Sequence, residues 1–175
     1  KQFAHPGSQE HQEFDVNQTI ESTIEVARGQ WKYIAELETD FADDLPTLTG
    51  HLGEFNQIIL NLIVNAAQAI EESSKCVGGF IQVRTTFDNH TLSVDVSDNG
   101  CGVPKSIQDR IFEPFFTTKD VGKGTGQGLA LCYRIMNQGF KGSVDVRSNE
   151  GKRATFSLHF PIEMSRLEKQ ELVAD

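Results

Sequence analysis

The pattern of apolar and polar positions is most regular in a segment that begins near Glu54. Its apolar residues recur at steps of three and four, which is the spacing of one buried face of a helix. They are Phe55, Ile58, Ile59, Leu62, Ile63, Ala66 and Ile70. Shorter helical periods begin at about Asp15, where Asp15 or Asn17 can cap the first turn, and at about Gln127. The sequence therefore predicts three helices.

Apolar and polar residues alternate, as in a strand, in five other segments. They are residues 34–41, 81–87, 92–97, 143–148 and 154–161. A turn at Asp88-Asn89 joins the second and third segments, which is typical of a hairpin. Helices and strands in this order predict an α/β fold, a two-layer sandwich in which helices cover one face of a mixed sheet.

The two ends of the chain lack this regularity. Residues 1–14 include Pro6 and Gly7 without an apolar period, and residues 162–175 form a charged stretch with sparse apolar positions. At 175 residues, 38% of them hydrophobic, the chain can bury one good core. We expect a linker over residues 1–14, a single domain over residues 15–161 and a polar tail over residues 162–175.

The composition argues against several classes of function. The net charge of −9 and the pI near 5.0 disfavour binding to nucleic acid or to an anionic membrane surface. Cys76, Cys101 and Cys132 lack the short paired spacings of a zinc site or a disulfide framework, which favours a reducing cytoplasm. There is no run of about 18 apolar residues and no signal-peptide pattern, so we expect this piece neither to span a membrane nor to be secreted.

A second, polar stripe follows the helix that begins near Glu54. It consists of Glu54, Gln57, Asn61, Asn65, Gln68 and Glu72. A solvated face is one interpretation, but such faces usually mix lysine with glutamate, and asparagine is a mediocre helix former. A carboxamide oxygen also suits magnesium, when water and phosphate fill the remaining ligand positions. The stripe therefore offers a possible metal-binding face.

Asp98 follows the predicted strand 92–97 and shares the parity of its apolar residues. Those residues are Leu92, Val94 and Val96. Asp98 should therefore point into the buried layer, where an unpaired carboxylate is costly and the exocyclic amine of adenine is a fitting donor. The alternative is that Asp98 only starts the Asn-Gly turn after it. Gly100 and Gly102 would let the backbone approach the base without a Cβ in between.

Residues 117–125 contain one hydrophobic residue, Val121, so we expect a mobile lid that phosphates organise. Lys119 and Lys123 are candidate contacts of a γ-phosphate, with plain surface lysine as the alternative. The glycine-rich turn 124–128 comes just before a helical segment. Such glycines can mark an ordinary turn, but at a helix start they can also present backbone N–H groups to phosphates.

Four segments together resemble a known family. They are residues 61–69, 98–104, 111–119 and 124–129. In this order they resemble the asparagine, first glycine, phenylalanine and second glycine motifs of the nucleotide-binding domain of sensor histidine kinases. Asn-Ala-Ala-Gln-Ala and Phe-Phe-Thr-Thr-Lys look most like the nitrogen-regulation type. The wider superfamily includes gyrase-type topoisomerases, the heat-shock chaperone ATPase and mismatch-repair ATPases, and the resemblance implies their Bergerat-type ATP-binding fold.

The resemblance implies ATP and magnesium as ligands, with Asn65 on the metal and Asp98 on adenine. Further residues implied to bind the nucleotide are Gly100, Gly102, Phe112, Gly124, Thr125, Gly126, Gln127, Gly128 and Leu129. Those implied in catalysis are Asn61, Lys119 and Lys123. In the hydrolysing branches, a glutamate one turn before the magnesium asparagine activates water. Here that position is Asn61, which cannot act as a general base, so transfer of the phosphate is favoured over hydrolysis.

The acceptor histidine of the family is missing from the chain. No histidine is followed by the family's Glu/Asp and Asn/Thr pattern, among His5, His11, His51, His90 and His159. We therefore expect the catalytic fragment of a histidine kinase, a transferase that passes the γ-phosphate of ATP to a histidine on the dimerisation domain of its own parent. Relay to a response regulator receiver domain would follow. We expect a homodimeric parent, which can be membrane-bound while this fragment is cytoplasmic.

Two alternatives stay open. One is a hydrolysing ATPase of the same fold. The other is a nucleotide-gated interaction module without catalysis, which two departures from the family pattern support. Arg153-Ala154 replaces a Gly-Thr pair and so removes a threonine hydroxyl near adenine, and residues 138–142, Gln-Gly-Phe-Lys-Gly, replace a His-Gly-Gly sequence.

Overall fold

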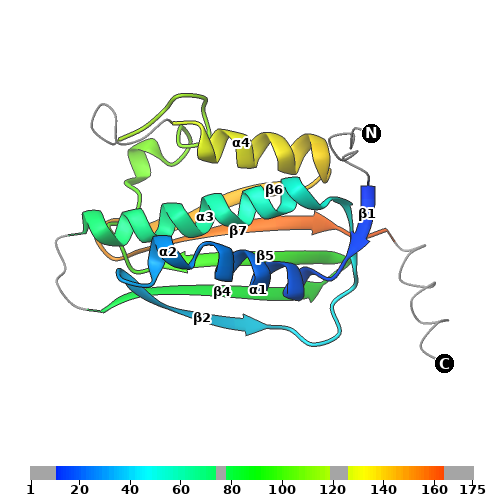
Figure 1. Ribbon diagram of the computed structural model, residues 1–175. Helices are drawn as coiled ribbons and strands as arrows, with labels where there is room; N and C mark the ends of the chain where they lie inside the picture. The colour runs from blue at the N-terminus through cyan, green and yellow to red at the C-terminus, as the bar shows by residue number, and fades with distance from the viewer. Residues whose placement is uncertain (1–10, 74–77, 119–125, 164–175) are drawn as a thin grey trace, which may run out of the picture.

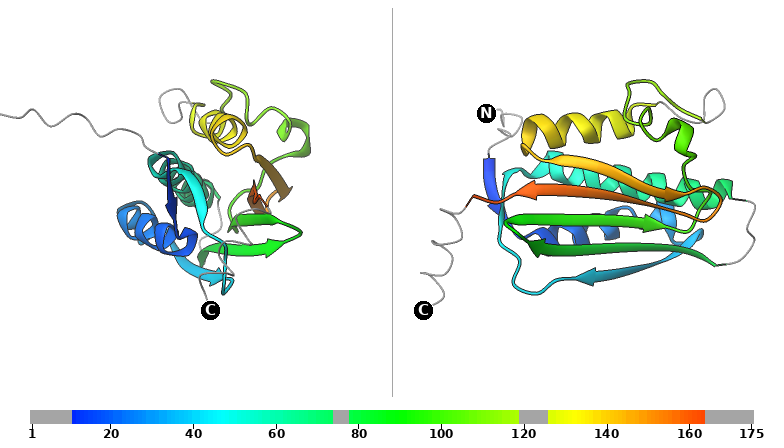
Figure 2. Two further views of the ribbon diagram at one scale, coloured as in Figure 1. Left: turned by 90° about the vertical axis from the view of Figure 1, so that its right-hand side faces the viewer. Right: turned by 180° about the vertical axis from the view of Figure 1, so that it is seen from behind.

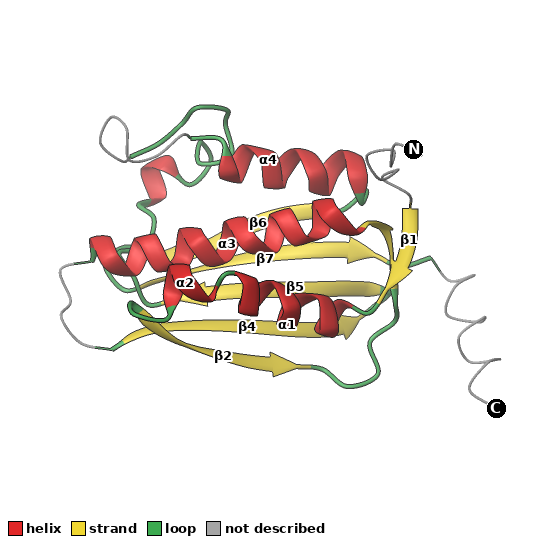
Figure 3. Cartoon of the chain, viewed as in Figure 1, coloured by secondary structure: helices red, strands yellow, loops and turns green. Residues whose placement is uncertain are grey.

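A computed structural model of the chain describes residues 11–73, 78–118 and 126–163. Helices and strands are arranged in two layers (Figures 1 and 3). The strands are β1 (His11–Phe14), β2 (Ala35–Phe41), β3 (Leu48–His51), β4 (Gly79–Asp88), β5 (Thr91–Asp98), β6 (Ser143–Asn149) and β7 (Arg153–Pro161). The helices are α1 (Val16–Val26), α2 (Arg28–Trp31), α3 (Leu52–Glu72) and α4 (Gly128–Arg134), with a 3-10 turn at Lys105–Ile107 and a π-helical turn at Ile135–Gly139.

Five strands form the main sheet in the order β2-β4-β5-β7-β6. β2 runs parallel to β4, and the other neighbours are antiparallel, so the sheet is mixed. The helices lie on one face, and the view from behind shows the other face without a helix over it (Figure 2). The predicted two-layer sandwich is therefore confirmed. Among the described residues, no helix is both long enough and apolar enough to cross a membrane.

The core lies between α3 and the inner face of the sheet. All of the apolar residues predicted for the buried face of α3 are buried. They pack on inner-facing side chains of the strands, among them Ile81, Val83, Leu92, Val94, Phe156, Leu158 and Phe160. Asp15 caps α1, because its Oδ1 accepts a hydrogen bond from the Gln18 N–H at 2.9 Å.

The strands β1 and β3 were missed by the sequence analysis. They form a separate two-stranded antiparallel sheet, so residues 11–14, which we had assigned to a linker, are paired with Leu48–His51. Only Phe14 of β1 is buried, and its ring lies 5.1 Å from that of Phe55. Four residues with one buried side chain contain no alternation that a sequence pattern could reveal.

The helix predicted near Gln127 is present but changes its form before it ends. α4 passes into a π-helical turn, in which the N–H of Phe140 donates to the carbonyl of Ile135, five residues earlier, at 3.2 Å. The N–H of Gly142 then donates to the carbonyl of Met136 at 2.8 Å. These bonds end the helix and direct the chain into β6.

Candidate functional site

A cavity of about 670 Å³ opens between α3, the segment after β5 and the start of α4. This volume falls within the range of about 300–1,000 Å³ that is typical of small-molecule sites. Side chains from widely separated parts of the chain line it, including Asn61, Asn65, Asp98, Val103, Phe116 and Leu129. The structure therefore brings together residues from all four motifs of the sequence.

Asp98 is the most unusual group in this cavity. It is the last residue of β5, and 3% of its surface is exposed. Its Oδ1 accepts a hydrogen bond from the Gly100 N–H at 2.8 Å, while its buried Oδ2 has no hydrogen-bond partner among the described residues. Burial raises the pKa of Asp98 from 3.8 to about 6, although the Gly100 N–H and the charge of Arg153 act in the opposite direction. A buried acceptor without a donor fits a ligand that supplies one.

Asn61 and Asn65 lie one turn apart on α3, and both line the cavity. The Nδ2 of Asn61 donates to the carbonyl of Gly128 at 3.3 Å, and its Oδ1 accepts from the Nε2 of Gln57 at 2.9 Å. Asn61 therefore connects α3 to the start of α4. The half-buried side chain of Asn65 makes no hydrogen bond to a described residue, so its carboxamide oxygen is free to bind a metal ion in the cavity.

Gly100 and Gly102 approach other parts of the protein closely. A Cβ on Gly100 would lie 2.5 Å from the carbonyl carbon and oxygen of Ala69 in α3. Gly102 has a φ of +67°, and a Cβ there would collide with the carbonyl oxygen of Asn149. Gly102 lines the cavity, whereas Gly100 is not among the lining residues. Gly100 therefore allows close contact with α3, and Gly102 allows close contact with the β6–β7 hairpin. We had predicted instead that both glycines allow the backbone to approach a base.

Gly126, Gly128 and Leu129 line the cavity at the start of α4. Gly126 has a φ of +65°, and its carbonyl accepts a hydrogen bond from the Phe115 N–H at 2.8 Å. Gln127 occupies the position before the first residue of α4 and is exposed. The predicted contacts Lys119, Lys123, Gly124 and Thr125 lie outside the described residues.

Phe112 packs beside the cavity instead of lining it. Its ring centroid lies 6.3 Å from that of Phe156 and 6.0 Å from that of Tyr133. Apolar lining comes instead from residues that were not predicted as site residues, although all except Ile107 lie within the first glycine and phenylalanine motifs: Val103, Pro104, Ile107, Ile111 and Phe116. The available signal for this wall was the set of apolar residues in the connection 103–116, which the sequence pattern alone could not divide between the cavity and the core.

Arg153-Ala154, which replaces the Gly-Thr pair of the family pattern, changes the lining of the cavity beside Asp98. Ala154 is the cross-strand neighbour of Asp98 and lines the cavity, so this position brings no hydroxyl to the carboxylate. The next residue, Thr155, points to the other face of the sheet. There its Oγ1 lies 2.8 Å from the Oγ of Ser97.

The sequence profile of a family described as "Histidine kinase-, DNA gyrase B-, and HSP90-like ATPase" matches residues 50–164. The chain therefore belongs to this family. A similar protein is the signal transduction histidine-protein kinase AtoS of Escherichia coli (strain K12), with 34% identity over 167 residues. The alignment covers 92% of this chain and 26% of AtoS, so the chain spans about a quarter of that relative.

Solved structures agree with the fold. The catalytic domain of histidine kinase ThkA has a TM-score of 0.73 at 24% identity, and the match covers 87% of this chain and 95% of that domain. Full-length ShkA, whose structure was solved with AMPPNP, has a TM-score of 0.71 at 25% identity over 90% of this chain and 32% of ShkA.

Proposed function

We propose that this chain is the catalytic domain of a sensor histidine kinase and that it binds ATP together with magnesium in the cavity beside α3. The single observation that carries the proposal is that Asp98 lines the cavity and that its buried Oδ2 has no hydrogen-bond partner among the described residues. The neighbouring apolar wall, with Val103, Ile107 and Phe116, provides a surface for a flat aromatic base.

The adenine end of the nucleotide would lie at Asp98. Its carboxylate would accept a hydrogen bond from the exocyclic amine, which satisfies the buried oxygen and offsets the cost of its burial. The similarity to ShkA supports a nucleotide as the ligand, since the structure of that protein was solved in complex with AMPPNP.

The phosphate end would lie toward Asn65 and the start of α4. Asn65 would supply one oxygen ligand to magnesium, and the bound ion would neutralise phosphate charge. The backbone of Gly126 and Gly128 lines this part of the cavity. Gly124 and Thr125, together with Lys119 and Lys123 as contacts of the γ-phosphate, complete the proposed site.

Phosphate transfer is favoured over hydrolysis because of Asn61. It occupies the position one turn before Asn65, and its amide is held between Gln57 and the Gly128 carbonyl. An amide cannot remove a proton from water, so water is not activated for attack on the γ-phosphate. The proposed nucleophile is a histidine. That histidine would belong to the dimerisation domain of the homodimeric cytoplasmic or membrane-bound parent, and a response regulator receiver domain would then accept the phosphate.

The test is transfer in trans. The chain is incubated with γ-labelled ATP, magnesium and a separately prepared dimerisation domain of its own parent, and an acceptor domain with His→Gln at the phosphorylated position is the control. We expect acid-labile phosphate on the intact acceptor only, with a rate that rises with acceptor concentration.

Each other result would support a specific alternative. Rapid release of phosphate without labelling of the acceptor would identify a hydrolysing ATPase. Magnesium-dependent nucleotide binding with neither reaction would identify a nucleotide-gated interaction module.

A further inference from the structure

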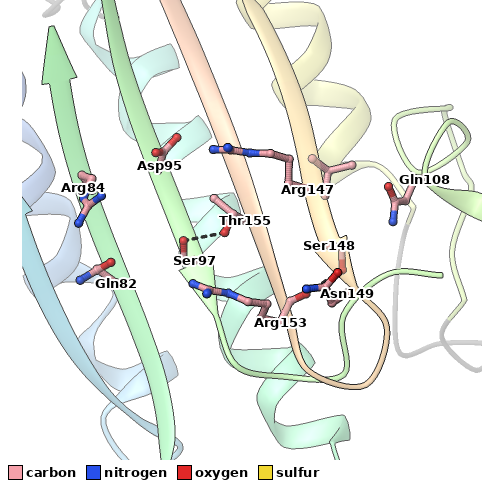
Figure 4. A pocket seen from close by; sticks show the side chains of 11 residues that line it. Gln82, Arg84, Asp95, Ser97, Gln108, Arg147, Ser148, Asn149, Arg153 and Thr155 are labelled. Carbon is pink, nitrogen blue, oxygen red and sulfur yellow. Dashed lines mark hydrogen bonds between the residues drawn. The ribbon is translucent and has the colours of Figure 1, made fainter. Parts of the chain in front are cut away.

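A second hollow lies on the opposite face of the sheet from the nucleotide cavity. It has a volume of about 530 Å³ and is formed by side chains of β4, β5, β7 and β6, together with Gln108 (Figure 4). We refer to it as the outer groove. The helix layer covers the other face of the sheet, so this groove is accessible from solvent (Figure 2).

Three arginines line the outer groove, in a chain whose net charge is −9. Arg84 forms an ion pair with Asp40 at 2.7 Å. Arg147 and Arg153 are exposed, and neither forms an ion pair with another described residue. Figure 4 shows both of these side chains extending from their strands toward β5. The groove thus offers two available guanidinium groups on one side of a sheet.

The chemistry of the groove fits a carboxylate-bearing peptide. A guanidinium is a planar fork of donors that matches a carboxylate. The groove also contains neutral amides and hydroxyls, which can bond a peptide backbone: Gln82, Gln108, Asn149, Ser97 and Thr155. The carboxylate of Asp95 also lines the groove and would repel a ligand with dense negative charge. Among the described residues, Val146 is the only apolar residue that lines the groove. These features disfavour a polyphosphate, a nucleic acid or an inserted lipid surface.

The outer groove and the nucleotide cavity share one segment as a wall. The Oγ of Ser148, in the groove, accepts a hydrogen bond from the Val103 N–H at 2.7 Å and donates to the Arg153 carbonyl at 2.8 Å. Gln108 Nε2 donates to the Val103 carbonyl at 2.9 Å. Val103 itself lines the nucleotide cavity. Groove side chains therefore hold both backbone groups of a residue in the nucleotide site.

Arg153 provides a second connection between the two sites. It lines the outer groove, and its charge also acts on Asp98 in the nucleotide cavity. A carboxylate bound to Arg153 would offset the charge of Arg153. The pKa of Asp98 would then rise, and its carboxylate would be ionised less readily.

We propose that the outer groove docks an acidic segment of a partner protein through Arg147 and Arg153, and that docking lowers the affinity of the nucleotide cavity through Val103 and Asp98. The surface is small and polar, so the contact is weak and transient, with electrostatic attraction guiding the encounter. Coupling of this kind is reciprocal, so nucleotide must weaken docking by the same factor.

The test uses a dye-labelled synthetic peptide with four glutamates in a Gly/Ser background, and a control peptide with glutamine in their place. Binding is measured by fluorescence anisotropy without nucleotide. Arg147→Gln should weaken binding of the acidic peptide about tenfold, whereas Arg28→Gln should leave it unchanged. Arg28 is a matched control because it is an exposed arginine on α2, in the helix layer. The glutamine peptide should not bind.

A second measurement tests the coupling. Saturating acidic peptide should weaken the binding of a fluorescent ATP analogue to the wild-type chain about fivefold, and the analogue should weaken peptide binding equally. At the same peptide concentration, the effect on the Arg147→Gln chain should be smaller, because weaker binding leaves less of that chain occupied.

Three results would overturn the proposal. They are equal losses in the Arg147 and Arg28 variants, no binding of the acidic peptide up to about 1 mM, and Arg147-dependent binding of anionic vesicles or an oligonucleotide without peptide binding. Unchanged nucleotide affinity with bound peptide would overturn the coupling. The peptide assay contains no nucleotide, so its failure is distinguishable from failure of the proposed kinase function.

Discussion

The carboxylate of Asp98 affects stability as well as binding. Its pKa in the folded chain is raised from 3.8 to about 6, mainly because burial disfavours the charged form. The folded state therefore binds the proton more tightly than the unfolded chain does. As the pH rises from about 4 to about 6, the free energy of unfolding falls by as much as about 3 kcal/mol, and this loss persists at higher pH.

Asp98→Asn should therefore stabilise the nucleotide-free protein, and the gain should depend on pH. It should be absent near pH 4, grow through pH 6 and stay constant above that value, since the amide carries no charge to bury. Urea denaturation at pH 4, 5, 6 and 8 measures it. Asp95→Asn, on the opposite face of β5, is the matched control for loss of a charge. An equal difference between wild type and Asp98→Asn at all four values would contradict this account.

The same substitution should weaken nucleotide binding. An amide can turn an N–H₂ donor toward the adenine amine, where an acceptor is needed, and the loss of a buried hydrogen bond costs about 1–3 kcal/mol, or about ten- to a hundredfold in affinity. Titration calorimetry with ATP and magnesium measures the effect. Unchanged affinity in a folded variant would remove Asp98 from the proposed site.

Asn65→Ala should separate the metal from the base. We expect adenosine to bind nearly as well as to wild type, while the magnesium-dependent part of ATP affinity disappears, since the substitution removes one oxygen ligand and leaves Asp98 untouched. ATP titrations with magnesium and with EDTA give the comparison. If magnesium improves ATP binding equally in both proteins, its ligand lies elsewhere.

At the scale of elements, β1 is joined to the core by a single side chain. Phe14 is 8% exposed and belongs to a chain of aromatic contacts through Phe55 to Phe140 and Phe160. Phe14→Ala should lower the free energy of unfolding by about 3 kcal/mol or more, because it leaves a cavity against α3. Phe115→Ala is the control, since Phe115 is 71% exposed and should change stability little. Equal effects in urea denaturation would show that β1 is not part of the cooperative core.

The contact between the turn after β5 and α3 gives another comparison. Gly100→Ala should destabilise the fold by more than about 2 kcal/mol, because the new Cβ would lie 2.5 Å from the backbone of Ala69. Gly53→Ala should instead be neutral or raise stability by up to about 1 kcal/mol, since Gly53 is helical and has nothing within 4 Å of a new Cβ. Thermal unfolding of the two variants side by side decides the point, and similar melting temperatures would contradict the close contact.

Long elements were predictable from sequence because their period repeats. α3 contains several full turns, and β5 alternates well enough to place Asp98 on the buried face. β1, β3 and α2 contain four residues each, which is too short for either period to be recognised. The reason for glycine at position 100 was also out of reach, because it depends on Ala69, which only folding brings near.

At the scale of the whole molecule, the two faces of the sheet differ in chemistry, because alternate residues of each strand point to opposite faces. The inner face carries the apolar core and Asp98, and the outer face carries the arginines of the outer groove. The parity of β5 predicted the first arrangement. The second could not be predicted, because it requires the register between β5 and β7, which joins two hairpins that are far apart in the sequence.

The parallel pairing of β2 with β4 has a consequence for the time course of folding. β4 with β5 and β6 with β7 are joined by short connections, and such hairpins can form within about 1–10 μs. β2 reaches β4 only after the chain has passed through β3 and α3, with Ala35 opposite Gly79, so this pairing must close a long loop. We therefore expect the edge strand β2 to dock late. Destabilising changes in β2 would then mainly accelerate unfolding, whereas those in the α3 core would slow refolding.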